Sequence, residues 1–240
     1  MKIKGSEKLH LYGNLKICGQ NKDAQCDTSV EILRYLDGKR DPCKLECDAR
    51  FVLVIEKYTI YQRIVESNFY EQFKPCLLLT AKGYPDLKTR RLLACIAKGY
   101  PEIPIFGLFD ADPHGLSIFC TYKFGTKNAA MQDESLKPIS VDKMELIGLL
   151  ATELESLQIK KSELLQLTEA DSALLSGLQR RKDIFIDRIL VDQINALRIS
   201  KLKCEIEVLD NLGAKTLFEY LKRKLNAFNF EPEQPASICE

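Results

Sequence analysis

The chain has 240 residues, 45% of them hydrophobic, and a formal net charge of +1. This length and apolar content suffice to bury a core and exclude a disorder-dominated class. The longest apolar runs are far shorter than a membrane span, and the opening residues MKIKGSEKLHLYG lack a hydrophobic signal core, so we expect a soluble, intracellular protein with no membrane partner. The near-balanced charge neither indicates nor excludes nucleic acid, because binding depends on where the charges lie.

Nine cysteines without an export signal are expected to be reduced thiols. Three lie in apolar segments and are predicted core residues: Cys76, Cys95 and Cys120. Four others have spacings that match no common zinc finger, which leaves zinc as a minor alternative: Cys18, Cys26, Cys43 and Cys47.

In chain order, the pattern first predicts short strands or loops over 9–18 and 28–36. From residue 51 onward, apolar runs typical of buried strands alternate with amphipathic segments typical of helices. The predicted order is strand 51–55, helix 59–73, strand 76–80, helix 87–98 with Asp86 as N-cap, strand 103–109 and helix 113–124. This alternation predicts an α/β fold with a parallel sheet.

After residue 138 the pattern becomes mainly helical, with helices expected near 142–157, 169–180, 183–199 and 201–225. We therefore expect four parts: lead-in strands and loops over 1–50, the metal-binding core over 51–140, a helical C-terminal part of the same domain over 141–228, and a flexible tail over 229–240.

Three carboxylates follow predicted strands. Glu56 comes after the first central strand, and Asp110 and Asp112 come after the third. Ligands of open α/β sheets gather at the carboxyl ends of the strands, and oxygen donors without a histidine cluster suit magnesium. Pro113 fits the first turn of the next helix, whose N-terminus favours an anion. The sequence thus predicts a magnesium site that holds a phosphate.

An Asp-x-Asp motif alone is weak evidence, because it also occurs in helix caps, phosphatases and glycosyltransferases. His114 and the mid-chain position argue against the phosphatase form. A helix cap remains open, as does a nucleotide-sugar enzyme that grips a diphosphate through manganese. The cationic stretch from Lys74 to Lys98 is either a basic patch or a solvated helix face.

Six segments, in this order and spacing, carry a family resemblance over roughly residues 1–225: VLVIEK (52–57), YQR (61–63), LLLTAKGYPDLKTRRLL (77–93), IPIFGLFDADPHGLSIFCTYKFG (103–125), IGLL (147–150) and KCEIE (203–207). Together they resemble the Toprim region of topoisomerase VI A subunits and of the related meiotic double-strand-break proteins (Spo-eleven type).

The resemblance implies a Toprim (Rossmann-like) α/β fold, with a parallel sheet, flanking helices and a mainly helical C-terminal part. It implies that Glu56, Asp110 and Asp112 hold Mg²⁺. In this family a tyrosine hydroxyl attacks the DNA backbone, so the implied activity is that of a DNA topoisomerase which makes double-strand breaks in meiotic recombination. Cationic residues near this edge are the expected DNA contacts: Lys82, Arg90, His114 and Lys123. His114 is equally well explained as a first-turn helix residue.

The implied partners are double-stranded DNA, a second copy of the chain in a homodimer, and an ATP-hydrolysing B-type subunit. The implied location is the nucleus. No GHKL-type nucleotide motif occurs in this sequence, so ATP use is expected of another chain.

The sequence also departs from the family pattern. Tyr58 stands where family members usually carry Asp, and Ala81 replaces a commoner Gly. The attacking tyrosine of the family lies in an N-terminal winged-helix domain, and none of the nine tyrosines here has its motif. We therefore expect an incomplete chain in which the three carboxylates remain. The alternative is a non-catalytic DNA-binding or dimerisation module that modulates a full-length partner.

Overall fold

The computed structural model describes residues 8–17, 45–126, 139–211 and 216–232. The element expected over 28–36 lies outside the described residues, as do Cys18, Cys26 and Cys43.

A five-stranded sheet forms the centre of the described part, in the order β1-β5-β4-β6-β7. Strand β4 lies in the middle and pairs in parallel with β5 and β6, and β6 pairs in parallel with β7. Strand β1 adds an antiparallel edge to β5. The strands are β1 (His10–Tyr12), β4 (Val52–Ile55), β5 (Leu77–Thr80), β6 (Ile105–Leu108) and β7 (Met144–Gly148). The predicted α/β class with a mostly parallel sheet is confirmed.

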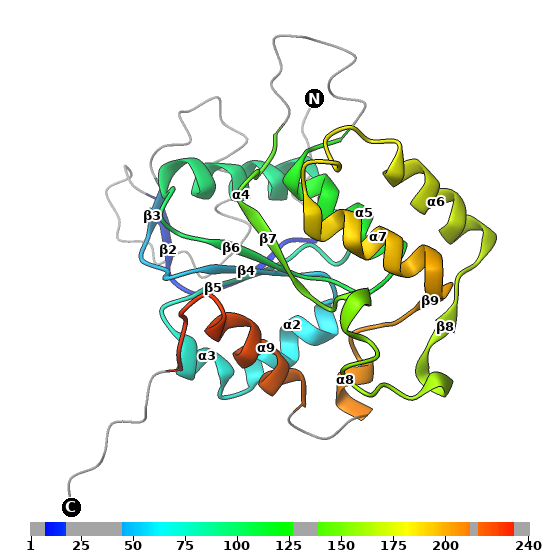
Figure 1. Ribbon diagram of the computed structural model, residues 1–240. Helices are drawn as coiled ribbons and strands as arrows, with labels where there is room; N and C mark the ends of the chain where they lie inside the picture. Colours follow the sequence, from blue (N-terminus) through cyan, green and yellow to red (C-terminus); the bar gives the residue numbers. More distant parts are fainter. Residues whose placement is uncertain (1–7, 18–44, 127–138, 212–215, 233–240) are drawn as a thin grey trace, which may run out of the picture.

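Helices cover both faces of this sheet (Figure 1). Figure 1 shows α4, α5 and α7 on one side and α2, α3 and α9 on the other. The helices are α2 (Tyr58–Glu66), α3 (Phe69–Phe73), α4 (Leu87–Gly99), α5 (Pro113–Lys123), α6 (Glu169–Gln179), α7 (Arg188–Ser200), α8 (Val208–Asn211) and α9 (Thr216–Asn226). Two single-turn 3₁₀ helices lie between β7 and α6: η2 (Ala151–Glu153) and η3 (Lys161–Glu163).

The central strand explains why the chain has two cores. Every residue of β4 is buried, and successive side chains point to opposite faces. Val52 and Val54 join the core beneath α4, α5 and α7, whereas Leu53 and Ile55 join the core beneath α2, α3 and α9. A strand buried on both faces requires the continuous apolar run that the sequence shows.

Two short antiparallel ladders lie outside the main sheet. Strands β2 (Leu15–Ile17) and β3 (Leu45–Cys47) form one, and β8 (Leu165–Gln166) and β9 (Leu202–Lys203) form the other. The second ladder leads directly into a bridge between Cys204 and Ala111. It therefore brings the C-terminal part of the chain to the end of β6.

The helix predicted over 142–157 is wrong. Residues Met144–Gly148 form the edge strand β7, and only a single 3₁₀ turn follows. A short apolar run such as MELIG fits a buried strand as well as a helix, and only pairing with β6 distinguishes the two.

Other predicted helices change at their ends. The helix expected over 59–73 divides at Ser67, which has an extended backbone. The one expected over 201–225 does not begin at 201, because Lys201 adopts a left-handed conformation that ends α7, and β9, α8 and α9 follow as separate elements.

Two composition-based expectations can be compared with the structure. Within the described ranges, no helix is long and apolar enough to cross a membrane. The five described cysteines are all free thiols. Cys76 and Cys120 are buried as predicted, while Cys95 is half-buried.

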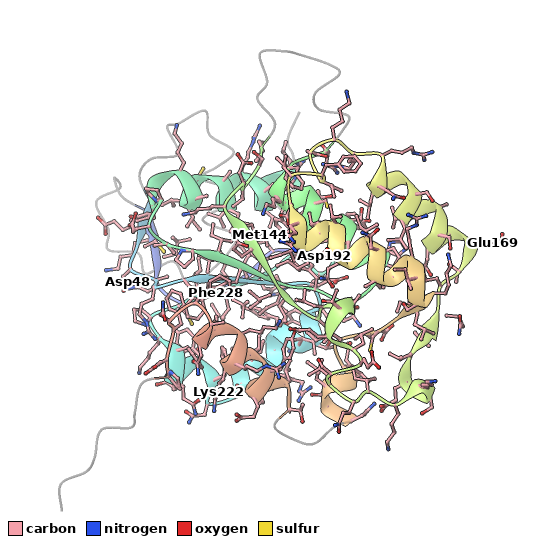
Figure 2. The ribbon with its side chains drawn as sticks, in the orientation of Figure 1. Asp48, Met144, Glu169, Asp192, Lys222 and Phe228 are labelled. Atoms are coloured by element: carbon pink, nitrogen blue, oxygen red, sulfur yellow. The ribbon has the colours of Figure 1, made fainter. Side chains whose placement is uncertain are left out.

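The aromatic contacts of Phe106 test the packing beneath α9. Phe106 is fully buried on β6, and its ring lies 4.8 Å from that of Phe228 and 5.9 Å from that of Phe51 (centroid distances). Figure 2 shows Phe228 below the sheet. Phe106→Ala should lower the free energy of unfolding by about 3–5 kcal/mol, because it leaves a cavity. The matched control is Phe185→Ala, at a side chain that is 63% exposed, with an expected change within about 0.5 kcal/mol. Urea unfolding of both variants measures the difference, and equal losses would contradict this packing.

Candidate metal centre at the sheet edge

The carboxylates of Glu56 and Asp110 meet because β4 and β6 are parallel neighbours in register. Ile55 pairs with Leu108, so the residues that follow the two strands emerge at the same edge. The Glu56 amide donates to the Leu108 carbonyl at 3.0 Å. The Asp110 amide in turn donates to Glu56 Oε2 at 2.9 Å. The predicted meeting of these two acids is therefore present.

Asp110 is 5% exposed, and both of its carboxylate oxygens have partners. Oδ1 accepts a hydrogen bond from the Ile206 amide at 2.9 Å. Oδ2 lies 3.0 Å from the Lys57 ammonium. Lys57 comes shortly after β4, whereas Ile206 lies 96 residues after Asp110 in the chain.

Asp112 serves as the N-cap of α5. Its Oδ1 accepts a hydrogen bond from the Gly115 amide at 2.6 Å, and Pro113 occupies the first turn. A Cβ atom on residue 115 would collide with the Asp110 carbonyl oxygen, so this position requires glycine. The capping alternative for the Asp-x-Asp motif is confirmed. The cap uses one oxygen of Asp112, which leaves the second oxygen as a potential ligand at this edge of the sheet.

The segment 204–207 forms an outer wall of the site. Ala111 and Cys204 exchange two backbone hydrogen bonds, of 2.9 and 3.0 Å. Lys57 Nζ lies 2.6 Å from Glu207 Oε2 and 3.3 Å from Glu205 Oε2. Sequence reasoning assigned no role to Lys57, Glu205 or Glu207. These residues lie in the motifs VLVIEK and KCEIE, which carried the family resemblance. The sequence did not show that the two motifs meet, because the ion pairs between Lys57 and the two glutamates join distant parts of the domain.

Burial and like charges make this edge electrostatically unfavourable without a cation. Burial, followed by the neighbouring Asp110 carboxylate, raises the pKa of Glu56 to about 8. Burial also raises the pKa of Asp110, to about 6, although the Ile206 amide and Lys57 oppose that shift. Burial alone would lower the pKa of Lys57, but hydrogen bonds to Glu207 and Asp110 outweigh it and the pKa is raised.

The donor set suits Mg²⁺, although the three acids are not arranged as a complete centre. Among the described residues, no three His, Cys, Asp or Glu side chains are arranged so that they could hold a metal ion. Glu56 and Asp110 nevertheless form a buried pair of oxygen donors, and burial, followed by the neighbouring Asp110 carboxylate, raises the pKa of Glu56. Hard oxygen donors of this kind fit a magnesium ion.

Two of the four predicted DNA contacts lie beside this pair of acids. Lys82 is exposed in the turn after β5, where the Gly83 amide donates to the Glu56 carbonyl at 3.0 Å. Its ammonium lies 4.4 Å from the centre of the Tyr58 ring. His114, in the first turn of α5, has a side chain that is 54% exposed. The Lys82 and His114 side chains are both accessible to a phosphate.

His114 also belongs to a cluster around Asp171, the residue that completes the capping box of α6 with Thr168. Asp171 Oδ1 lies 3.9 Å from His114 Nε2, and Oδ2 lies 2.7 Å from Lys203 Nζ. Burial acts to raise the pKa of Asp171, but the hydrogen bonds from Lys203 and Thr168 outweigh it and lower the pKa to about 2. The carboxylate thus stays charged, with Lys203 bound to one oxygen and His114 facing the other.

Of the other two predicted DNA contacts, Lys123 is engaged in the fold and Arg90 is half-buried. Lys123 has a 12% exposed side chain, pairs with Asp187 at 2.7 Å and donates to the Met144 carbonyl at 2.8 Å. Arg90 is half-buried on α4, where burial lowers the pKa of its guanidinium. The contacts of Lys123 would have to open before it could reach a phosphate.

The mostly parallel sheet, with acids at the ends of two adjacent central strands, agrees with the Toprim fold that the sequence resemblance implies. Residues 51–225 match the family model that describes the Toprim domain of Spo11 and of the A subunit of topoisomerase 6. The chain belongs to this Spo11 and topoisomerase 6 family. This family match argues against the nucleotide-sugar alternative that the Asp-x-Asp motif alone left open.

Curated relatives extend the match beyond the Toprim residues. The chain is 33% identical to "Meiotic recombination protein SPO11" of Homo sapiens over 228 residues, which cover 93% of this chain and 56% of that protein. It is 36% identical to "Meiotic recombination protein SPO11-2" of Oryza sativa subsp. indica, over 74% of this chain and 44% of that protein. It is 33% identical to the A subunit of DNA topoisomerase 6 from Arabidopsis thaliana, over 75% of this chain and 42% of that protein. The chain spans about half the length of the curated relatives it matches.

The raised pKa of Glu56 predicts how stability depends on pH in the absence of metal. Because the folded state holds this proton more tightly than the unfolded state, its stabilising contribution is complete below the ordinary pKa of 4.5. The contribution is lost as the pH rises through about 8. The free energy of unfolding in a chelator should therefore fall across this window, and Glu56→Gln should flatten the fall.

Urea unfolding at several pH values measures this effect. The matched control is Glu66→Gln, at an exposed residue that ends α2. If Glu56→Gln and Glu66→Gln follow the same pH dependence as the unchanged protein, the electrostatic account of Glu56 is wrong.

Proposed function

We propose that this chain forms the magnesium-binding and DNA-binding part of a type IIB topoisomerase A-like protein, which makes DNA double-strand breaks by tyrosine transesterification in meiotic recombination. The observation that carries the proposal is the buried pair Glu56 and Asp110 at the ends of β4 and β6. The family match, and the names of the human and plant relatives, supply the reaction class. The proposal includes double-stranded DNA, a homodimer, a B-type subunit that hydrolyses ATP, and action in the nucleus.

In this proposal Glu56, Asp110 and Asp112 hold Mg²⁺. When bound, the ion supplies positive charge next to the phosphate and stabilises the charge that develops on its oxygens. Lys82 and His114 position the backbone by contacts to neighbouring phosphates, which carry no sequence information. Arg90 and Lys123 stay in the proposal as further phosphate contacts, and Lys123 would first have to leave Asp187 and the Met144 carbonyl.

The attacking tyrosine is proposed to come from a winged-helix domain outside residues 51–225. Burial raises the pKa of Tyr61, Tyr122 and Tyr220, which is the opposite of what activates a nucleophile. In the reaction a bond forms between the tyrosine oxygen and phosphorus as the bond from phosphorus to the 3′ oxygen breaks. The tyrosine proton ends on that 3′ oxygen, and the 5′ end stays attached to the protein.

The same tyrosines favour the second candidate function. If residues 1–240 act alone, the chain is a non-catalytic DNA-binding or dimerisation module that modulates a full-length partner. A covalent adduct between the chain and 3′-labelled duplex, detected by denaturing electrophoresis with Mg²⁺ present, would exclude this module and would identify a nucleophile within the chain.

Asp112 allows its capping and metal-binding roles to be separated. Asparagine caps helices as well as aspartate does, so Asp112→Asn should leave the free energy of unfolding within about 0.5 kcal/mol. It removes a charged oxygen donor, so the affinity for Mg²⁺ should fall by about tenfold or more. Calorimetric titration with Mg²⁺ measures the second effect. Unchanged magnesium affinity in Asp112→Asn would remove Asp112 from the metal site, and no metal-dependent heat in the unchanged chain would overturn the metal site as a whole.

Phosphate contacts should appear in the salt dependence of duplex binding. Replacing Lys82 or His114 by Ala should weaken binding equally for unrelated sequences, and loss of the Lys82 contact should reduce the slope of log K against log salt by about 1. The control is Lys222→Ala on α9, where Lys222 pairs with Glu219 and lies at the lower side of the molecule in Figure 2. Fluorescence anisotropy at several salt concentrations measures the slopes. A slope that Lys222→Ala changes as much as Lys82→Ala would argue against a defined DNA-binding edge.

A further inference from the structure

The Lys57 ammonium lies among three carboxylates from two parts of the chain. It is 2.6 Å from Glu207, 3.0 Å from Asp110 and 3.3 Å from Glu205. Lys57 precedes α2, and its side chain makes no capping hydrogen bond to that helix. Its side chain is only 25% exposed, so the ammonium is held inside the acidic edge rather than in bulk solvent.

These contacts divide the carboxylates of the site into two groups. Glu205, Glu207 and Oδ2 of Asp110 are turned to the ammonium. Glu56 receives only the backbone amide of Asp110 among the hydrogen bonds made to its carboxylate in the described chain. Glu56 is therefore the acid without a cationic hydrogen-bond partner among the described residues, and the carboxylates on the side of the 204–207 wall share the Lys57 ammonium.

We propose that Lys57 is a built-in monovalent cation that limits the site to one divalent ion. The inference rests on the proposed magnesium site and specifies how many ions that site takes. With Lys57 in place, Asp110, Glu205 and Glu207 are not arranged as a metal site. Removal of the ammonium would leave these three carboxylates without their shared cation and able to turn toward a divalent ion, which binds carboxylate oxygens. With the ammonium in place, a second ion would have to displace a cation that already has three carboxylate partners.

Lys57 is a positioning residue in this proposal, because it also ties the 204–207 wall to the end of β4. Lys57 could act only by tying the 204–207 wall to β4, or its charge could exclude a second ion. Replacing Lys57 by a neutral residue distinguishes the two roles. A tie alone predicts a looser site that binds its first ion more weakly. An excluding charge predicts that a second ion binds.

The experiment counts Mn²⁺ ions on the full chain by calorimetry and by electron paramagnetic resonance of the free ion. The unchanged chain should bind one ion, and Lys57→Met should bind two. Lys57→Arg keeps the charge and should return the count to one. In Lys57→Met combined with Glu205→Gln and Glu207→Gln, the donors of the second ion are removed, so the count should also return to one. Lys222→Met is the matched control for removing one lysine charge elsewhere, and it should leave the count at one.

Other outcomes separate this inference from the proposed function. If the unchanged chain binds no Mn²⁺, the proposed metal site fails, and the inference fails with it. If the unchanged chain and Lys57→Met both bind one ion, only the inference is overturned. Where circular dichroism shows that Lys57→Met does not fold, Lys57→Gln removes the charge but keeps an amide donor, and the same count of two is expected. In the unchanged Lys57 background, Glu205→Gln with Glu207→Gln should leave the count at one; a count of zero would make these residues ligands of the first ion and overturn the inference.

Discussion

The close approach of two buried carboxyl groups, Glu56 and Asp110, is the constraint on which the rest of this edge depends. The approach is fixed by the backbone, since β4 and β6 are parallel neighbours with Ile55 opposite Leu108. Two acids in a buried setting repel each other and resist ionisation. Three groups stabilise negative charge on these carboxylates: the backbone amides of Asp110 and Ile206 and the ammonium of Lys57. The remaining charge is what makes a divalent cation a suitable ligand.

The compensation comes from parts of the chain that are far apart in sequence. The turn after β6 pairs with Cys204, and this pairing brings the Ile206 amide to Asp110. The turn after β5 contacts the Glu56 backbone and presents Lys82. The site is consequently a property of the whole domain, and the segment after α7 contributes as directly as the strands do. This explains why the family match runs from residue 51 to residue 225 instead of ending with the last central strand.

The sequence predicted the centre of the fold and the location of the acids well, because buried parallel strands require continuous apolar runs and their carboxyl ends share an edge. FVLVI and IPIFGLF are such runs, so the sequence alone was enough to locate Glu56 and Asp110. Sequence reasoning failed at MELIG, whose strand conformation depends on pairing with β6. It also assigned Lys57, Glu205 and Glu207 no role, since the contact between Lys57 and Glu207 joins positions 150 residues apart and leaves no local pattern. Lys123 was predicted to contact DNA because it lies near this edge in the sequence. Its ion pair with Asp187 depends on the fold and leaves no pattern around residue 123.

The cluster around Asp171 has a consequence for how forces reach the acidic edge. One carboxylate completes the capping box of α6, binds Lys203 and faces His114 on α5. Lys203 is followed directly by Cys204, which is paired to Ala111 between the two acids of the Asp-x-Asp motif. The N-terminus of α6, the start of α5 and the segment that leads into the 204–207 wall therefore meet at one carboxylate. A displacement of the N-terminus of α6 would move the other two elements with it.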